Sequence, residues 1–370
     1  MRVSRLQVHR FARTLLSALL LALIFHVIFC NEVQALLAGT NIHWEELPKW
    51  EQRRLAWTRG PAALWETTRQ LDPISLLTAF AACGLLVVIG GLRWRLVLRV
   101  QGLDLSVREV MRISFIAHFF NAFLLGTAGG DVVKAWYVAK AAPERRPEAA
   151  LTVFADRVLG AMALLLFAAV CAIPNFSLIY RYPRHWAVLL MVLGMLAVAA
   201  LFVFLGFYTN ALQPGRRLAR WMARVPKGGS FARAMAACRT FGQHPGFLAE
   251  VSLWSLLVNV CIVLAYVALA RGLHLEVPWV TLAYVSAAVV SVAAIPVTPA
   301  GLGVRENLFV WLLASPVFDI RPGLALSLSL LGYTVNLAWS VVGGIVYLLA
   351  PSETKYLVRS TSTATSGTRH

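Results

Sequence analysis

Seven polar or ionisable side chains lie within long apolar stretches of the chain or directly beside them. An ionisable side chain in hydrocarbon costs at least about 2.5–3.5 kcal/mol, so each one needs a partner or a purpose. Arginine suits phosphate because its planar guanidinium bonds two oxygens at once, and a helix N-terminus adds backbone N–H donors for an anion. We therefore expect a water-accessible cavity that binds a charged group; the alternative is a set of buried structural ion pairs. The candidate binding residues are Asn121, Asp131, Lys134, Asp156, Arg157, Arg305 and Glu306.

Two clusters of glycine and proline interrupt the apolar stretches that carry these residues. Backbone that is not helical is tolerated at membrane depth only where it is buried in protein or lines a wet cavity. Broken helices that meet at mid-membrane are typical of a substrate path in transporters. We expect breaks at Gly126, Gly129 and Gly130 in the first stretch, and at Pro296, Pro299, Gly301 and Gly303 in the second.

The composition identifies the elements that must position these residues. Hydrophobic residues make up 59% of the 370 residues and charged ones only 14%, and the mean hydropathy is +0.70. A soluble globular chain has about 25% charged residues, so a soluble enzyme and a secreted disulfide scaffold are excluded. Uncharged runs such as Ile74–Leu92 and Trp186–Tyr208 are long enough to cross a bilayer as helices. The sequence predicts an all-α polytopic integral membrane protein.

The basic residues determine the expected topology. The net charge is +17, which we attribute to the enrichment of Lys and Arg in cytoplasmic loops and not to a nucleic-acid partner. The loop Thr209–Gly246 holds seven basic residues and no acid, and one arrangement that brings it inside is for Ile113–Lys140 to enter and leave the membrane on the same side. We expect Trp279–Phe318 likewise to enter and leave the membrane on one side, turning at Pro296–Gly303. We predict about six full spans plus two re-entrant broken-helix hairpins in an inverted pair, with both termini cytoplasmic.

The chain divides into three predicted regions. Residues 1–72 would hold an N-terminal helix, Thr14–Cys30, and a Trp-rich segment on the outer surface; a cleaved signal peptide is the alternative for the helix. Tryptophan favours the headgroup region, although a packed pair of helices outside the membrane would also explain the segment. Residues 73–350 form the membrane domain, and 351–370 a disordered tail. The tryptophans of the outer segment are Trp44, Trp50, Trp57 and Trp65.

Other residues carry weaker signals. A lone His or Asn in a membrane helix is more often an interhelical hydrogen bond than a site, and Arg93 and Arg95 are expected to be interface anchors. The five cysteines have no CxxC spacing, and the sequence has no HExxH, GxSxG or P-loop motif. We therefore expect no metal, no cofactor and no catalytic residue. The residues assigned to interhelical bonds are His118, Asn121, Asn259, Tyr333 and Asn336, of which Asn121 is also a binding candidate.

Three ordered motifs over Ile74–Ala350 resemble a known family, the flippase-like membrane domain of the lysylphosphatidylglycerol synthases. The same domain occurs in stand-alone proteins described as dolichol-phosphate glucose synthetase-like. The sequence differs slightly from the family pattern, with Lys134 where Arg is usual and Ala300 where Gly is usual. The motifs are FNAF at 120–123 with GTAGGD at 126–131, Asp156-Arg157 followed by Gly160, and PVTPAGLGVRE at 296–306.

The resemblance implies a protein of the bacterial inner membrane that moves, or helps to move, a lipid between leaflets. The chain stops near Pro351 without the aminoacyl-transfer domain of the full-length synthases, so lipid aminoacylation is not expected. One alternative is an accessory subunit that partners a lipid-modifying or glycosyl-transferring enzyme. Another is a membrane-embedded transferase with Asp131 or Glu306 as its base.

Overall fold

The computed structural model describes most of the region between residue 44 and residue 350. The described residues are 26, 29–30, 32–34, 36–37, 44–70, 72–122, 129–208, 239–244, 246–295, 303–314, 317–318, 320 and 322–350. The regular elements of this part are α-helices and short 3-10 helices. The predicted all-α membrane fold is confirmed. Gly126, Pro296, Pro299 and Gly301, the helix Thr14–Cys30 except for three residues, and the tail lie outside the described residues.

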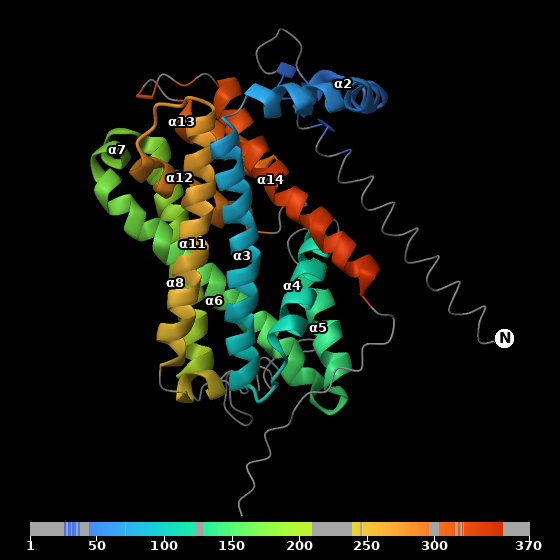
Figure 1. Cartoon of the computed structure of the whole chain (residues 1–370). Coiled ribbons are helices and arrows are strands. Elements are labelled where there is room, and N and C mark those ends of the chain that lie inside the picture. The colour runs from blue at the N-terminus through green and yellow to red at the C-terminus, as the bar shows by residue number, and fades with distance from the viewer. Residues whose placement is uncertain are drawn as a thin grey trace, which may run out of the picture.

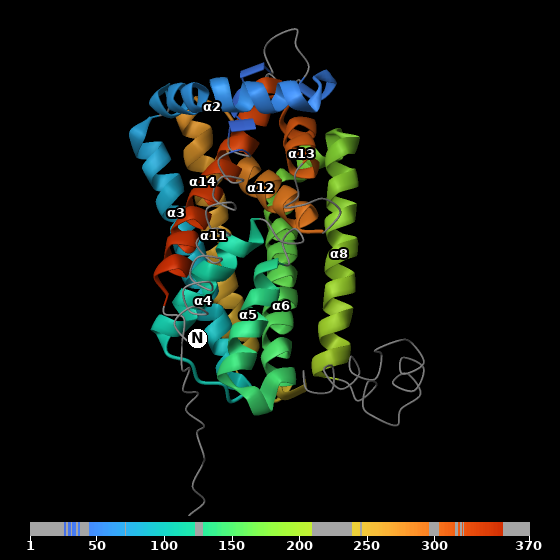
Figure 2. The same ribbon diagram turned by 90° about the vertical axis from the view of Figure 1, so that its right-hand side faces the viewer.

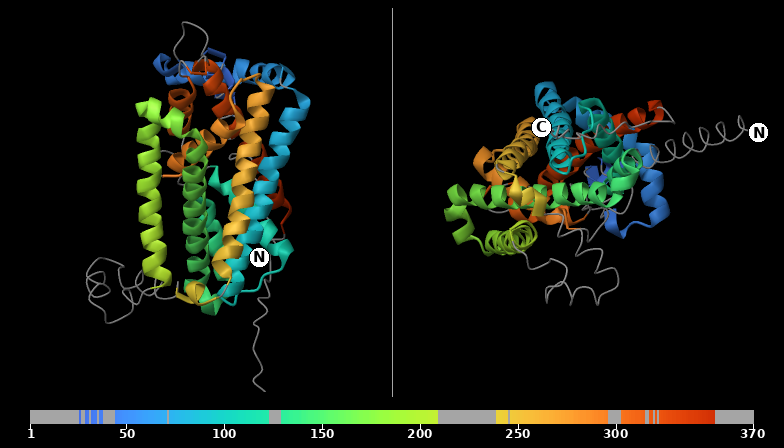
Figure 3. Two further views of the ribbon diagram at one scale, coloured as in Figure 1. Left: turned by 90° about the vertical axis from the view of Figure 1, so that its left-hand side faces the viewer. Right: turned by 90° about the horizontal axis from the view of Figure 1, so that it is seen from below.

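Five long helices form the body of the bundle and are long and apolar enough to cross a membrane. They correspond to five of the six predicted full spans, and the number of helices that cross stays a prediction. α3 and α11 lie side by side along their length (Figures 1 and 3). The five are α3 (Pro73–Val100), α6 (Arg146–Ala172), α8 (Pro183–Phe207), α11 (Phe247–Gly272) and α14 (Pro322–Leu349).

The start of α3 shows how local sequence sets a helix boundary. Asp72 caps the helix by accepting hydrogen bonds from the Ser75 backbone N (2.9 Å) and Oγ (2.8 Å). These bonds hold the pKa of the Asp72 carboxyl below its ordinary value. Pro73 occupies the first helical position, where its missing N–H costs nothing. The helix then continues to Val100, eight residues beyond the predicted end at Leu92.

Two pairs of shorter helices lie at opposite ends of the bundle. In Figure 2, α4 (Val107–Asn121) and α5 (Gly129–Ala141) occupy the lower half, and α12 (Trp279–Ala293) and α13 (Val304–Leu313) the upper half. The chain leaving the first pair comes back to the end of the bundle where α3 stops. Arg145, which follows α5, donates from its guanidinium to the carbonyl oxygens of Gln101 (2.8 Å) and Gly102 (3.2 Å), directly after α3.

The second pair begins and ends at the opposite end of the bundle. Thr281, near the start of α12, donates to Asn175 Oδ1 at 2.9 Å, in the 3-10 turn η4 (Ile173–Asn175) that follows α6. Arg184, at the start of α8, donates to the carbonyl oxygen of Trp311 near the end of α13, at 3.0 Å. The two helix pairs therefore have the predicted inverted arrangement. Short elements complete the connections: η3 (Pro143–Arg145) and α7 (Phe176–Arg181).

The helix boundaries in the two hairpins compare differently with the predicted breaks. α12 ends at Ala293, before Pro296, and α13 begins at Val304, directly after Gly303. α5 begins at Gly129, so the two glycines placed in the break form the first turn of a helix.

The helix α2 (Lys49–Gln70) lies across one end of the bundle, after the 3-10 turn η1 (Trp44–Glu46) (Figures 1 and 2). Trp50, Trp57 and Trp65 are exposed on it. The rings of Trp57 and Phe29 pack in a T-shaped arrangement, with centroids 5.4 Å apart. The position of this segment at a membrane surface stays a prediction, as does the division into three regions.

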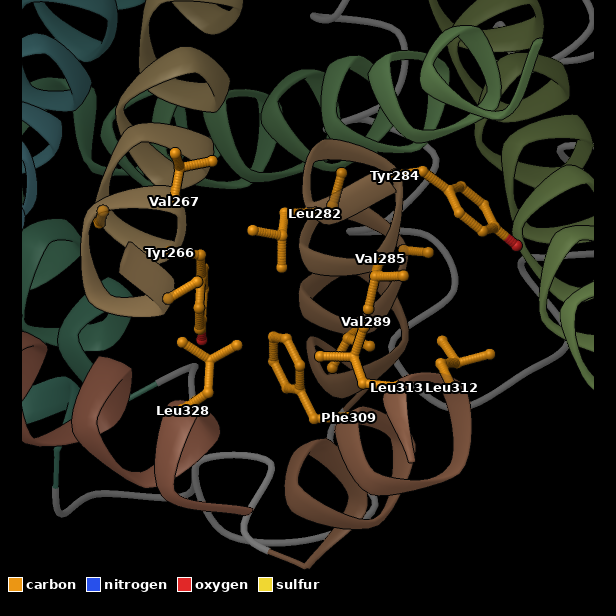
Figure 4. Close-up of a cluster of buried hydrophobic side chains, with 14 of the residues drawn as sticks. Tyr266, Val267, Leu282, Tyr284, Val285, Val289, Phe309, Leu312, Leu313 and Leu328 are labelled. Carbon is orange, nitrogen blue, oxygen red and sulfur yellow. The ribbon is translucent and has the colours of Figure 1, made fainter. Parts of the chain in front are cut away.

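The largest apolar core joins the second hairpin to its neighbours. Figure 4 shows side chains of α11, α12, α13 and α14 converging on one cluster. Phe309 of α13 faces Tyr266 of α11 with ring centroids 4.9 Å apart, and both are buried. This packing holds α12 and α13 against the long helices, which orients the residues at the start of α13.

Candidate functional site

Two adjoining cavities lie where both hairpins break. Each has a volume of about 280 Å³. The α5 cavity is lined by Asp131, Lys134 and Asp156, and the α14 cavity by Arg305 and Tyr333. Because they share lining residues, the two cavities adjoin, and both are lined by apolar side chains with a few polar and charged ones among them. The shared residues are Leu86, His118, Asn121, Arg157, Ile262 and Ala294.

Asp156 is paired with an arginine from another helix and not with its neighbour Arg157. The Arg93 Nε donates to Asp156 Oδ1 at 2.9 Å, and Arg93 Nη1 donates to Ser255 Oγ at 3.1 Å. The two charged side chains are only 12% and 10% exposed. Arg93 therefore joins α3, α6 and α11 beneath the α5 cavity, and its predicted role as an interface anchor is wrong.

A glycine provides the space for this guanidinium. A Cβ on Gly160 would lie 2.7 Å from both Nη atoms of Arg93. Gly160 is one turn after Asp156 on α6, so the same helix supplies the carboxylate and the space for its partner. Any larger residue at 160 would displace the guanidinium.

Among the residues that line both cavities, Arg157 carries a full charge. Its Nε lies 3.4 Å from Asp131 Oδ2, across the gap between α6 and α5. The Arg157 side chain is 45% exposed and that of Asp131 is 24% exposed. This pair is therefore more accessible to a ligand or to water than the pair formed by Arg93.

Lys134 lies one turn after Asp131 and lines the α5 cavity. Its ammonium group lies 4.7 Å from the centroid of the Trp94 ring. An ammonium over a tryptophan face is attracted by the ring quadrupole. Among the described residues, no carboxylate lies within 4.0 Å of this ammonium.

The first hairpin is closed by a contact between Asn121 and Gly130. The Asn121 Oδ1 accepts a hydrogen bond of 2.7 Å from the Gly130 backbone N, in the first turn of α5. A Cβ on Gly130 would lie 2.1 Å from the carbonyl oxygen of Ala117 on α4. Only glycine allows the two helices to approach this closely, so Gly130 has a structural role and Asn121 has both a structural and a cavity-lining one.

Arg305 and Glu306 open α13 and serve different purposes. Glu306 Oε2 accepts a hydrogen bond from the Gly303 backbone N at 2.6 Å, so it caps the helix. Gly303 has a φ of +82°, a backbone conformation that favours glycine. Arg305 pairs with Glu306, donates to Ser329 Oγ at 3.3 Å, and lies 4.3 Å from the centroid of the Tyr333 ring.

The seven predicted binding residues do not all line the same cavity. Asn121, Asp131, Lys134, Asp156 and Arg157 line the α5 cavity, whereas Arg305 lines only the α14 cavity. Glu306 is absent from the lining of both cavities. It acts indirectly, by pairing with Arg305 and by capping α13. His118 makes the expected interhelical contact, its Nε2 lying 3.2 Å from the Asn336 carbonyl oxygen, and both residues also line the α14 cavity.

Sequence reasoning missed Arg93 because a charge was taken to end the span. A usable signal was present: apolar residues continue after Arg93, at Trp94, Leu96, Val97 and Leu98. An arginine with apolar residues on both sides within one helix is a candidate for a buried ion pair. In the described part of the chain, no three His, Cys, Asp or Glu side chains form a group that could hold a metal ion.

Comparison with known proteins gives a consistent assignment. The family model described as "Lysylphosphatidylglycerol synthase TM region" matches residues 54–344, which include every element of both cavities. A UPF0104 membrane protein of Methanothermobacter thermautotrophicus is 25% identical over 268 residues, covering 66% of this chain and 74% of the relative. A UPF0104 membrane protein of Pyrococcus horikoshii is 23% identical over 321 residues, covering 80% of this chain and 92% of the relative. This chain is therefore a multi-pass membrane protein that belongs to the family of the lysylphosphatidylglycerol synthase transmembrane region.

Proposed function

We propose that this protein moves a lipid with an anionic phosphate headgroup between the two leaflets of its membrane. The observation that carries the proposal is the position of Arg157, which lines both cavities and has a side chain that is 45% exposed. A headgroup that leaves one cavity would meet the same guanidinium as it enters the other.

The arrangement of the two hairpins supports a path of this kind. They lie at opposite ends of the bundle (Figure 2), and residues that flank their breaks, such as Asn121, Ala294 and Arg305, line the two adjoining cavities. A headgroup would exchange its water for cavity side chains there, and its acyl chains would stay in lipid. Polar groups within a membrane domain are costly and mark such paths.

The proposed orientation follows from charge. α8 ends and α11 begins at the end of the bundle that also holds the turn between α5 and α6 (Figure 3). The sequence that joins α8 to α11 carries seven basic residues, and such loops stay in the cytoplasm. We place this end of the bundle, and both termini, in the cytoplasm.

Reconstitution tests the proposal. Purified protein in vesicles should move a fluorescent phosphatidylglycerol from the inner to the outer leaflet, measured by quenching with an impermeant reductant. Arg157→Gln should abolish this movement. Arg146→Gln is the matched control, because Arg146 begins the same helix, is exposed and lines neither cavity. Equal rates in protein-containing and empty vesicles would overturn the proposal and favour an accessory role beside a lipid-modifying or glycosyl-transferring partner.

A further inference from the structure

The charges around the two cavities do not balance. Three ion pairs account for six of the charged side chains: Arg93 with Asp156, Arg157 with Asp131, and Arg305 with Glu306. Lys134 is the seventh, and it also lines the α5 cavity. Four formal positive charges therefore face three formal negative charges among the described residues of this site. The excess is one positive charge.

The undescribed turns of the two hairpins do not alter this count. Residues 123–128 and 296–302 contain no Asp, Glu, Lys or Arg. The nearest acid to Lys134 along its own helix is Asp131, and that carboxylate lies against Arg157 at 3.4 Å. The Lys134 ammonium faces the Trp94 ring instead, at 4.7 Å from its centroid.

An unbalanced charge inside a membrane domain favours a ligand that neutralises it. A cation removed from water is costly unless it is paired, and a ligand of the opposite charge supplies the pairing. A ligand of charge −1 would make the site neutral, a neutral ligand would leave the excess in place, and a dianion would reverse it. Charge complementarity of this kind decides selectivity more than it decides affinity.

We infer that this site selects a lipid whose headgroup carries one net negative charge, a phosphodiester monoanion, and that Lys134 provides the charge that selects it. The inference rests on the proposed function, since it names the headgroup that the path admits. Arg157 and Arg305 keep their carboxylate partners while the headgroup is bound. The phosphodiester takes the place beside the ammonium, where no acid of the described residues lies.

A binding measurement tests selectivity without requiring transport. Purified protein in nanodiscs is titrated with fluorescent phosphatidylglycerol (net charge −1) and with phosphatidylcholine (net charge 0) of the same acyl chains. The native protein should prefer the first. Lys134→Gln should weaken phosphatidylglycerol binding about ten- to hundredfold, the range of one charge-assisted contact, and should leave phosphatidylcholine binding unchanged. Lys134→Arg should keep the preference.

Lys140→Gln is the matched control variant. Lys140 is on the same helix and its ammonium also lies over a tryptophan, 5.3 Å from the Trp136 ring centroid, but it is exposed and lines neither cavity. Its substitution should change neither affinity. A thermal unfolding midpoint close to that of the native protein shows that Lys134→Gln is folded. If that variant does not fold, Lys134→Arg and the double variant described next carry the test.

The double variant Asp131→Asn with Lys134→Gln restores an excess of one positive charge, which then resides on Arg157. The inference predicts that this variant regains the preference for phosphatidylglycerol that Lys134→Gln loses. A preference that is unchanged in Lys134→Gln, or a native protein that binds the two lipids equally, would overturn it.

The same phosphodiester chemistry exists in water-soluble ions, so a competition experiment separates the two sources. Glycerophosphoglycerol, the headgroup without acyl chains, should compete with the labelled lipid far more weakly than short-chain phosphatidylglycerol does. Equal competition would overturn the assignment of a lipid ligand. Failure of the proposed function is a separate outcome, because a protein that binds selectively but does not translocate retains the charge selection and loses only the transport role.

Discussion

Arg93 and Asp156 join two long helices through an ion pair of 2.9 Å, although 63 residues separate them in the chain. Both side chains are nearly buried, and Ser255 of a third helix accepts a further hydrogen bond from the same guanidinium. A buried ion pair whose arginine also bonds a third helix holds those helices in one register. The ion pair therefore contributes to the lining of the α5 cavity and fixes the part of α6 that carries the neighbouring Arg157.

Breaking this pair on one side should destabilise the protein. Asp156→Asn leaves the Arg93 charge buried without its partner, which typically costs about 3–5 kcal/mol. The midpoint of thermal unfolding in detergent should fall clearly. The double variant Arg93→Met with Asp156→Leu removes both charges and should recover most of the loss. A single variant as stable as the native protein would show that water reaches the pair and screens it.

Gly160→Ala should disturb the same pair without removing a charge. The new Cβ would lie 2.7 Å from two nitrogen atoms of Arg93, and overpacking of this kind costs about 1–3 kcal/mol. Gly194→Ala on α8 is the control, because its Cβ would meet nothing within 4 Å. Equal unfolding midpoints for the two variants would contradict the close packing around Arg93.

Gly130→Ala should open the first hairpin. A Cβ there would lie 2.1 Å from the Ala117 carbonyl oxygen and 2.7 Å from the Asn121 Oδ1. The helices α4 and α5 would have to separate, and the hydrogen bond from Gly130 to Asn121 would lengthen or break. We expect reduced stability together with reduced lipid movement in vesicles, and Gly194→Ala again serves as the control. A variant with normal movement would mean that the closed hairpin is not needed for transport.

Removal of the charges of both Arg305 and Glu306 separates a structural role from a ligand-binding one. Arg305→Met with Glu306→Gln deletes the ion pair but leaves an amide oxygen that can still accept from the Gly303 backbone N. We expect a folded protein that translocates lipid poorly, because the α14 cavity would have lost its own cation. Arg305→Lys should retain part of the activity, since it keeps the charge but not the planar fork. A double variant with full activity would make the pair a scaffold only.

The proposed orientation is testable by labelling from outside intact cells. In a variant whose five native cysteines are replaced, Glu144→Cys and Arg181→Cys place exposed thiols in η3 and α7, at opposite ends of α6. The thiol at 181 should react with an impermeant reagent and the thiol at 144 should react only after the membrane is opened. The reverse pattern would invert the topology, and labelling of both would contradict passage of α6 through the membrane.

Local sequence features were sufficient for the class of protein, for most of the long helices and for the existence of two hairpins. These follow from properties that are local along the chain: apolar length, the conformational freedom of glycine, and the charge of the connecting loops. The excess of basic residues in one loop was enough to predict that Ile113–Lys140 returns to the side it came from. Most of the candidate residues were found for the same reason, since a charge within an apolar run is visible without a structure.

Only the tertiary structure decided which charges pair. The sequence placed Asp156 beside Arg157, yet on a helix consecutive residues point in different directions. The carboxylate of Asp156 therefore faces Arg93 of α3, and the guanidinium of Arg157 faces Asp131 of α5. The apolar residues after Arg93 indicate that the helix continues, but no local pattern identifies Asp156 as the partner that neutralises this charge inside the bundle. The unmatched charge of Lys134 became apparent only once every other partner had been assigned in space.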